Sequence, residues 1–178
     1  MLDIFKGKVF VVGDNTDTDQ IIPAKHLVYS MKHPEERLNY GKYALSGLME
    51  EEHKVPFISS GYESEYSIII AGENFGCGSS REQAPASLMI AGVKVVLAKS
   101  FARIFYRNVI DVAYFIPLQL KEGNNEVFKT GDTVVVDIKQ GTVTKEEKHL
   151  SFYQLGEAKD ILEAGGIFAF ARENNWIK

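Results

Sequence analysis

Cysteine is almost absent from this sequence of 178 residues, which contains Cys77 alone. A chain with one cysteine forms no internal disulfide bond, and it cannot supply the several thiolates of a structural zinc site or an iron–sulfur cluster. We therefore assign no metal site to this chain. If a cluster takes part in its function, the ligands have to come from another chain.

Basic charge and long apolar runs are also scarce. The formal net charge is −4 at pH 7 with acids and bases interspersed, so no basic stripe indicates nucleic-acid binding. The longest apolar runs, such as SIIIAG, have the length of strands, and the chain does not start with a basic segment followed by a long apolar core. We expect a soluble cytoplasmic protein with neither nucleic-acid nor membrane partners, folded as one domain over residues 1–178.

Strand-like and helix-like patterns alternate along most of the chain. Strands are expected at 8–12, 65–72, 93–98 and 114–120, a loop at 13–19, and helices at 85–92 and 100–113. The alternation predicts an α/β fold with right-handed crossovers, a mainly parallel central sheet and helices packed on it. The segment DTVVVDIKQGTVT predicts a β-hairpin. Pro34 fits the first turn of a helix, and two short helices are expected on either side of Gly165 and Gly166.

The stretch GENFGCGSSREQAP, residues 72–85, places three glycines, two serines and an arginine between a strand and a helix. Ligands bind at this position in α/β sheets, because backbone N–H groups and the helix dipole attract anions there. The stretch lacks the third glycine of the dinucleotide fingerprint and contains no G-K-[ST] of a phosphate loop. A small carboxylate is therefore the favoured ligand, and Arg81 offers a planar fork that suits it.

Helix capping is an alternative explanation for the serines of this stretch. Ser79 with Glu82 and Ser80 with Gln83 both match the capping-box spacing, although only one pair can occupy the cap. Pro85 disfavours helix at the preceding residue, so residues 79–83 could also be loop throughout. We expect the thiol of Cys77 to pack within the turn rather than to take part in redox chemistry.

Three motifs occur in order: GDNTDTDQIIP at 13–23, GENFGCGSSREQAP at 72–85 and SFARIFYRN at 100–108. Together they resemble the small subunits of 3-isopropylmalate dehydratases, in the aconitase family. The resemblance covers nearly the whole chain. It implies a swivelling β/β/α domain that closes over a large subunit carrying a [4Fe–4S] cluster. It also implies a hydro-lyase, active only with that partner, that isomerises 2-isopropylmalate to 3-isopropylmalate through isopropylmaleate in leucine synthesis.

The resemblance also implies roles for individual residues. The first serine of SSR corresponds to the base that removes a carbon-bound proton, which assigns this role to Ser79. Ser80 and Arg81 correspond to positions that hold a substrate carboxylate. Thr18 and Asp19 correspond to positions near the active site, with turn formation as the alternative.

Val28 corresponds to the residue that faces the variable group of the substrate. Relatives that act on tricarboxylates such as homoaconitate carry arginine there, to pair with the extra carboxylate. Valine therefore favours a substrate with an isopropyl group at this position over homoaconitate. Removing one methyl group from such a contact costs only about 1 kcal/mol, so a related enzyme acting on citramalate or dimethylmalate stays an alternative. Core packing is the other explanation for Val28.

A carboxylate-binding module without catalysis is a further possibility for the whole chain.

Other charged residues are given no function. Asp14, Asp17 and Asp19 do not match the spacing of a calcium-binding EF-hand loop. Arg103 and Arg107 lie four apart, on one face of the expected helix. They suit a solvated face better than anion binding or a subunit contact.

Overall fold

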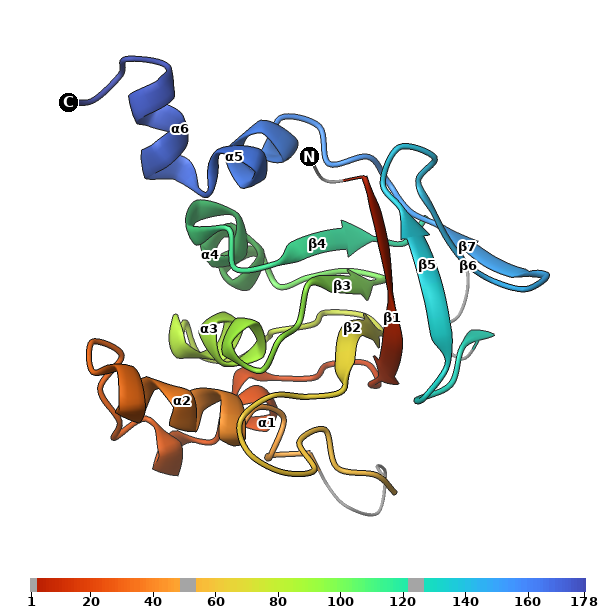
Figure 1. Cartoon of the computed structure of the whole chain (residues 1–178), viewed down its shortest axis with the longest axis horizontal. Coiled ribbons are helices and arrows are strands. Elements are labelled where there is room, and N and C mark those ends of the chain that lie inside the picture. Colours follow the sequence, from red (N-terminus) through yellow and green to blue (C-terminus); the bar gives the residue numbers. More distant parts are fainter. Residues whose placement is uncertain (1–2, 49–53, 122–126) are drawn as a thin grey trace.

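We describe a computed structural model of the chain, covering residues 3–48, 54–121 and 127–178. Seven strands form one sheet in the order β4-β3-β2-β1-β5-β6-β7 (Figure 1). The strands are β1 (Ile4–Val11), β2 (Tyr66–Ala71), β3 (Val95–Ala98), β4 (Ile116–Gln119), β5 (Thr133–Asp137), β6 (Thr142–Lys145) and β7 (Lys148–Ser151). The first four agree with the strands expected from the sequence, and β1 begins four residues earlier than predicted.

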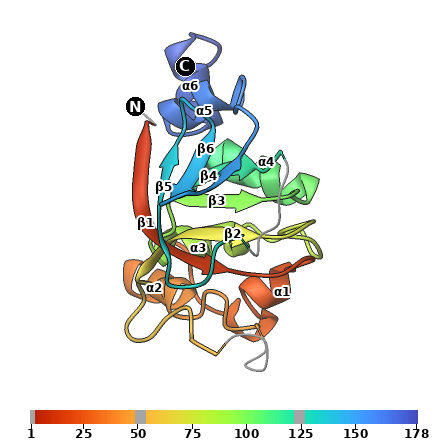
Figure 2. The same cartoon turned by 90° about the vertical axis from the view of Figure 1, so that its right-hand side faces the viewer.

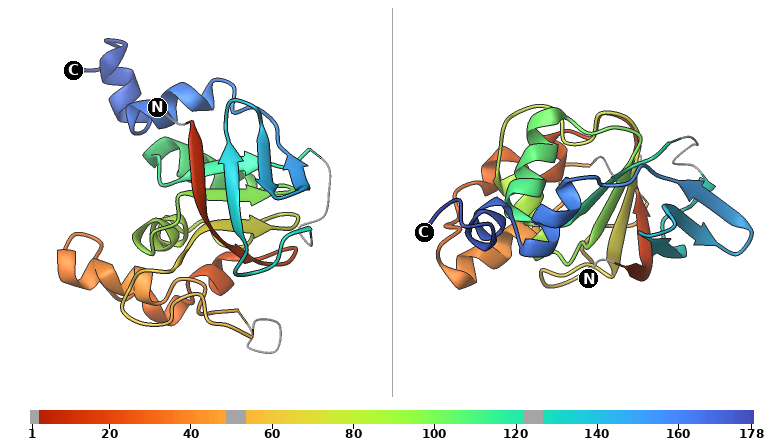
Figure 3. Two further views of the ribbon diagram at one scale, coloured as in Figure 1. Left: turned by 45° about the vertical axis from the view of Figure 1, so that its right-hand side comes forward. Right: turned by 90° about the horizontal axis from the view of Figure 1, so that it is seen from above.

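The strands β1 to β4 pair in parallel and follow each other in sequence across the sheet. Since every crossover then steps in the same direction, right-handed connections put their helices on one face. The helices α3 (Gln83–Ile90) and α4 (Arg103–Val112) lie on that face, and α2 (Pro34–Lys42) packs beside α3 (Figure 3). The predicted helices at 85–92 and 100–113 are thereby confirmed.

The strands β5, β6 and β7 are antiparallel and curl over the opposite face (Figures 1 and 3). Their buried side chains Val134, Val143 and Leu150 pack against Ile68 and other residues of the parallel strands. Helices, parallel strands and antiparallel strands thus form three layers, as a β/β/α domain requires. The predicted hairpin is β5–β6, and β7 enlarges the antiparallel half beyond the prediction.

Both faces of the parallel strands are buried. In β2, Ile69 points into the cluster beneath the helices, whereas Ile68 and Ile70 point into the cluster beneath the antiparallel strands. This explains the continuous apolar run SIIIA, which is typical of a strand covered on two sides. Among the described residues, no helix is long and apolar enough to span a membrane. The single domain expected from chain length stays a prediction.

The remaining helices are short. They are α1 (Thr18–Ile21), the 3-10 turn η1 (Ala24–His26), α5 (Ala158–Ala164) and α6 (Ile167–Glu173). Gly165 ends α5 in the left-handed conformation and Gly166 precedes α6, as the sequence predicts. Pro34 is the first residue of α2, which is also confirmed. The helix α1 falls within the motif 13–23, where only a loop was expected at 13–19.

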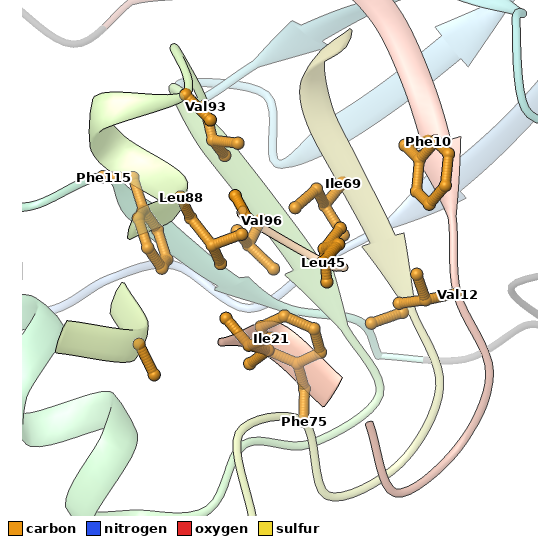
Figure 4. Close-up of a cluster of buried hydrophobic side chains, with 14 of the residues drawn as sticks. Phe10, Val12, Ile21, Leu45, Ile69, Phe75, Leu88, Val93, Val96 and Phe115 are labelled. Carbon is orange, nitrogen blue, oxygen red and sulfur yellow. The ribbon is translucent and has the colours of Figure 1, made fainter. Parts of the chain in front are cut away.

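The hydrophobic cluster beneath the helices extends to the loops that follow β1 and β2 (Figure 4). Ile21 of α1 and Phe75 of the glycine-rich stretch are fully buried there, in the same cluster as Val12 and Val96. The ring of Phe75 meets those of Phe101 and Phe105 edge-on, at centroid distances of 6.1 and 5.4 Å. The loops are thus anchored from below by core side chains.

Candidate functional site

The loops that follow β1, β2 and β3 lie side by side at the carboxyl ends of these strands (Figure 2). Backbone hydrogen bonds of 2.8 to 3.0 Å connect them, from the amides of Asn15, Gly76, Thr18 and Phe75 to the carbonyls of Glu73, Thr16, Cys77 and Ser100, respectively. Two distant sequence motifs and the start of the third therefore form one continuous surface. This edge of a parallel sheet is where ligands bind in α/β proteins.

Glycine is required at two positions of the stretch 72–85. Gly76 has φ +79°, and a β-carbon built there would lie 2.2 Å from the ring of Phe105. Gly78 has φ +92° and passes close to Thr18, whose hydroxyl would lie 3.2 Å from such a carbon. Any side chain would strain both turns. The glycines thus allow the loop to reach both α1 and α4.

Neither serine caps a helix. The cap residue of α3 is Glu82, which has helical dihedral angles and makes no side-chain cap hydrogen bond. Both capping-box predictions are therefore wrong, and Ser79 and Ser80 are loop residues. They are exposed, and the described residues offer neither hydroxyl a hydrogen-bond partner. The amide of Ser79 donates to the hydroxyl of Thr18 at 3.1 Å.

A capping box does occur in the first motif. The carboxylate of Asp17 accepts from the amide of Gln20 at 2.7 Å, and the Gln20 side chain accepts from the amide of Asp17 at 2.9 Å. These two bonds stabilise the single turn of α1. Thr18, the first residue of that turn, is buried against the glycine loop.

Arg81 and Asp19 are in direct contact. The two terminal nitrogens of Arg81 donate to the two carboxylate oxygens of Asp19, at 2.7 and 3.2 Å. One of them also donates to the carbonyl of Ile22 at 3.3 Å. The hydrogen bond from Arg81 is the main cause that lowers the pKa of Asp19. The pair is therefore charged at neutral pH and fixes the orientation of the guanidinium.

A cleft of about 300 Å³ opens above the glycine loop. Its lining consists of Thr18, Gly76, Gly78, Ser79, Ser80, Arg81, Ala102, Arg103, Ile104, Phe105 and Asn108. Four of the residues predicted to bind or react with substrate, Thr18, Ser79, Ser80 and Arg81, thus line one cavity. Asp19 does not line it but is in direct contact with Arg81.

The other wall of the cleft is the start of α4. Its cap residue, Ala102, makes no side-chain cap hydrogen bond, so the first-turn amides and the positive end of the helix are available on that side. Arg103 and Asn108 line the cleft as well. Arg103 is exposed, as expected for a solvated face, and it also borders the cleft, which was not predicted. The position of Arg103 in the third motif could have indicated a place at the cleft, whereas helical spacing alone could not.

Val28 does not line this cleft. Its side chain is 78% exposed, which rules out core packing within the described chain. The segment that carries it is held against α2, because the rings of His26 and Tyr43 stack at a centroid distance of 3.7 Å. The hydroxyl of Tyr40 also donates to the carbonyl of Tyr29 at 2.7 Å. The segment is thus well supported although Val28 itself is free of packing.

The thiol of Cys77 is partly buried and lies 3.5 Å from the carbonyl oxygen of Asn15. Burial is the main cause that raises its pKa, and the charge of Asp17 adds to it. This agrees with the packing role expected for the residue. Within residues 3–48, 54–121 and 127–178, no three His, Cys, Asp or Glu side chains come together as a metal site would require.

Comparisons with known proteins agree with this geometry. Residues 13–123 match the family model of the aconitase C-terminal domain. The 3-isopropylmalate dehydratase small subunit 1 of Arabidopsis thaliana is 45% identical over 181 residues, covering 97% of this chain and 70% of the relative. The chain belongs to the aconitase family.

Two further comparisons cover nearly the full length of both chains. The isopropylmalate/citramalate isomerase small subunit of Methanocaldococcus jannaschii is 39% identical, with 97% of this chain and 96% of the relative covered. A crystal structure of 3-isopropylmalate dehydratase from the same organism superimposes with a TM-score of 0.77 at 36% identity, covering 97% of this chain and 96% of the other. The family resemblance and the fold expected from the sequence are both confirmed.

Proposed function

We propose that this chain is the small subunit of a 3-isopropylmalate dehydratase. In the assembled enzyme it converts 2-isopropylmalate to 3-isopropylmalate by removing water and adding it back at the neighbouring carbon. The observation that carries this proposal is the position of Ser79. It lies in a cleft with two arginines at the carboxyl ends of the parallel strands, in a chain of this family.

The proposed role of Ser79 is to remove the proton from the carbon next to a substrate carboxylate. Its hydroxyl is exposed in the cleft and has no competing partner in the described chain. The backbone amides of Gly78, Ser80 and Arg81 also donate to no acceptor in the described chain. They can therefore stabilise an alkoxide or a substrate oxyanion. The proton taken by the oxygen of Ser79 returns to the adjacent carbon when water is added back.

Substrate binding is proposed for residues beside Ser79. Ser80 offers a hydroxyl and an amide to a carboxylate, and Arg81 offers the remaining N–H groups of a guanidinium that Asp19 already holds in place. Thr18 acts on the loop: its buried hydroxyl accepts from the amide of Ser79 and so fixes the backbone of the proposed base.

The [4Fe–4S] cluster of this reaction is proposed to lie on a large subunit. With one cysteine, this chain does not fit such a cluster. The departure of the substrate hydroxyl therefore belongs to the partner's half of the site. Swivelling of this domain over that half is part of the same proposal.

Two observations bear on the substrate. Val28 is apolar and exposed, so it can meet an alkyl group and cannot pair with a third carboxylate. This favours alkylmalates over homoaconitate. Citramalate is the second candidate, since the relative from M. jannaschii is named isopropylmalate/citramalate isomerase. A binding module without catalysis has less support, because the proposed base is exposed in the cleft.

Reconstitution tests the proposed function. The chain is mixed with the cluster-bearing subunit from the same genome, and hydration of isopropylmaleate is followed by its ultraviolet absorbance. We expect turnover with both subunits and none with either alone. Tight binding of alkylmalates to the lone chain, together with no turnover by the pair, would favour the binding module instead.

The substrate assignment is tested with the variant Val28→Arg. We expect it to reduce turnover of 2-isopropylmalate by about tenfold or more, because a charge replaces an apolar contact. Val112→Arg is the matched control, since Val112 is an exposed valine outside the cleft. Equal effects of both variants on kcat/KM would remove Val28 from substrate recognition.

A further inference from the structure

The two arginines of the cleft differ in their partners. Arg81 is committed to Asp19 through both terminal nitrogens and to the carbonyl of Ile22. The side chain of Arg103 forms no ion pair or hydrogen bond with any residue that the structure describes. A dicarboxylate brings two negative charges into the cleft, and Arg81 is already largely neutralised. The uncommitted positive charge on the cleft wall is that of Arg103.

We propose that Arg103 binds one carboxylate of the dicarboxylate substrate, with the side-chain amide of Asn108 as a second donor. This inference rests on the proposed function and adds two substrate-binding residues to it. Both residues line the same cleft as Ser79. Arg103 begins α4 and Asn108 follows five residues later, so the two belong to neighbouring turns of one helix.

The start of α4 is fixed relative to the proposed base. The amide of Ala102 donates to the carbonyl of Phe75 at 2.9 Å. The ring of Phe105 lies against Gly76, where no side chain would fit. Arg103 stands between these two anchor points in the sequence. Its backbone therefore keeps one position with respect to Ser79, while its long side chain can adjust to the substrate.

Arg107 offers an internal comparison. It lies one turn further along α4, is exposed, and does not line the cleft. Its guanidinium pairs with Asp111 at 3.4 Å, in the i,i+4 arrangement typical of a helix surface. The two arginines thus share a helix and a motif but differ in surroundings.

The test uses the assembled enzyme with Arg103→Gln, Arg103→Lys and the control Arg107→Gln. For Arg103→Gln we expect KM for 2-isopropylmalate to rise about tenfold or more with kcat changed less than threefold, because a charge-assisted bond to the substrate is lost. Arg103→Lys should recover part of the loss, since the charge is retained. Arg107→Gln should leave both constants unchanged.

Association of the two subunits is measured in parallel by analytical ultracentrifugation. Unchanged KM for Arg103→Gln overturns the inference. So does a variant whose only defect is weaker association, because Arg103 would then contact the partner.

If the wild-type pair turns over no alkylmalate, the proposed function fails and calorimetry decides on Arg103. Weaker binding of 2-isopropylmalate to the variant pair than to the wild-type pair then supports the inference. Equal binding to both pairs, or none to either, overturns it.

Discussion

Asp19 holds Arg81 by two hydrogen bonds, one from each terminal nitrogen of the guanidinium. The Arg81 side chain is 17% exposed, whereas that of Asp19 is 57% exposed. The contact therefore serves to orient a mostly buried arginine rather than to bury an ion pair. A guanidinium that is oriented before the substrate arrives loses less freedom on binding, which favours affinity and rate.

The first prediction concerns this contact. Asp19→Asn should lower kcat/KM of the assembled enzyme about 10- to 100-fold, because Arg81 loses its fixed position beside the reacting atoms. The melting temperature should change little, because the Asp19 side chain is more than half exposed and an ion pair with a solvated partner contributes little to stability. Asp14→Asn is the control, because Asp14 accepts from the amide of Glu73 in the same loops and asparagine keeps that acceptor. Unaltered kcat/KM in Asp19→Asn would show that the orientation of Arg81 is set elsewhere.

The second prediction concerns the close contact between the glycine loop and α4. Gly76→Ala should destabilise the protein by about 2–5 kcal/mol, from overpacking against the ring of Phe105 and from a positive φ. Gly92→Ala also places alanine at positive φ, but its β-carbon would meet no atom within 4 Å. That control should cost about 1–2 kcal/mol. Urea unfolding measures both, and equal losses would mean that the contact with Phe105 relaxes without cost.

The third prediction concerns His26. Burial is the main cause that lowers its pKa below 6.5 in the folded chain, and the charge of Lys25 adds to it. The unfolded chain then binds more protons than the folded one just below pH 6.5, so the free energy of unfolding should fall as pH drops through that range and level off below the folded pKa.

His26→Tyr isolates this effect. Tyrosine keeps an aromatic ring for the stack with Tyr43 and does not titrate near pH 6. Chemical unfolding between pH 5 and pH 8 should therefore show a shallower decline for the variant than for the wild type. Identical slopes would assign the decline to other groups.

Much of the architecture follows from the sequence, because the burial of each helix or strand sets the pattern of its apolar residues. The continuous apolar run SIIIA is typical of a strand covered on both faces, and it occurs in β2. The spacing of Phe105 and Val109, four residues apart, is typical of an amphipathic helix, and it occurs in α4. The strand β7 escaped prediction because only Leu150 of its four residues is buried. The helix α1 escaped because it is a single turn, held by the capping box of Asp17 rather than by an apolar stripe.

The candidate residues could be named from the sequence, but their contacts could not, and their roles stay predictions. The motifs identified Ser79, Ser80, Arg81, Thr18 and Asp19, and the structure brings them together. The capping-box spacing gave a wrong prediction for Ser79 and Ser80. A serine caps a helix only if the helix begins at the next residue, and α3 begins at Gln83.

The exposure of Arg103 was predicted, but its position beside the cleft was not. Whether a surface arginine faces solvent or a cleft depends on the loop packed against its helix, and this loop comes from a distant part of the chain.

The proposed proton transfer by Ser79 is tested most directly by the turnover of the assembled enzyme with Ser79→Ala. The amide of this residue still donates to Thr18 in the variant, so the loop and the association of the subunits should be preserved. We predict that kcat falls at least about 1,000-fold while substrate still binds, because no other group at this position takes the proton. A kcat within tenfold of the wild type, in a variant that assembles normally, would contradict the account.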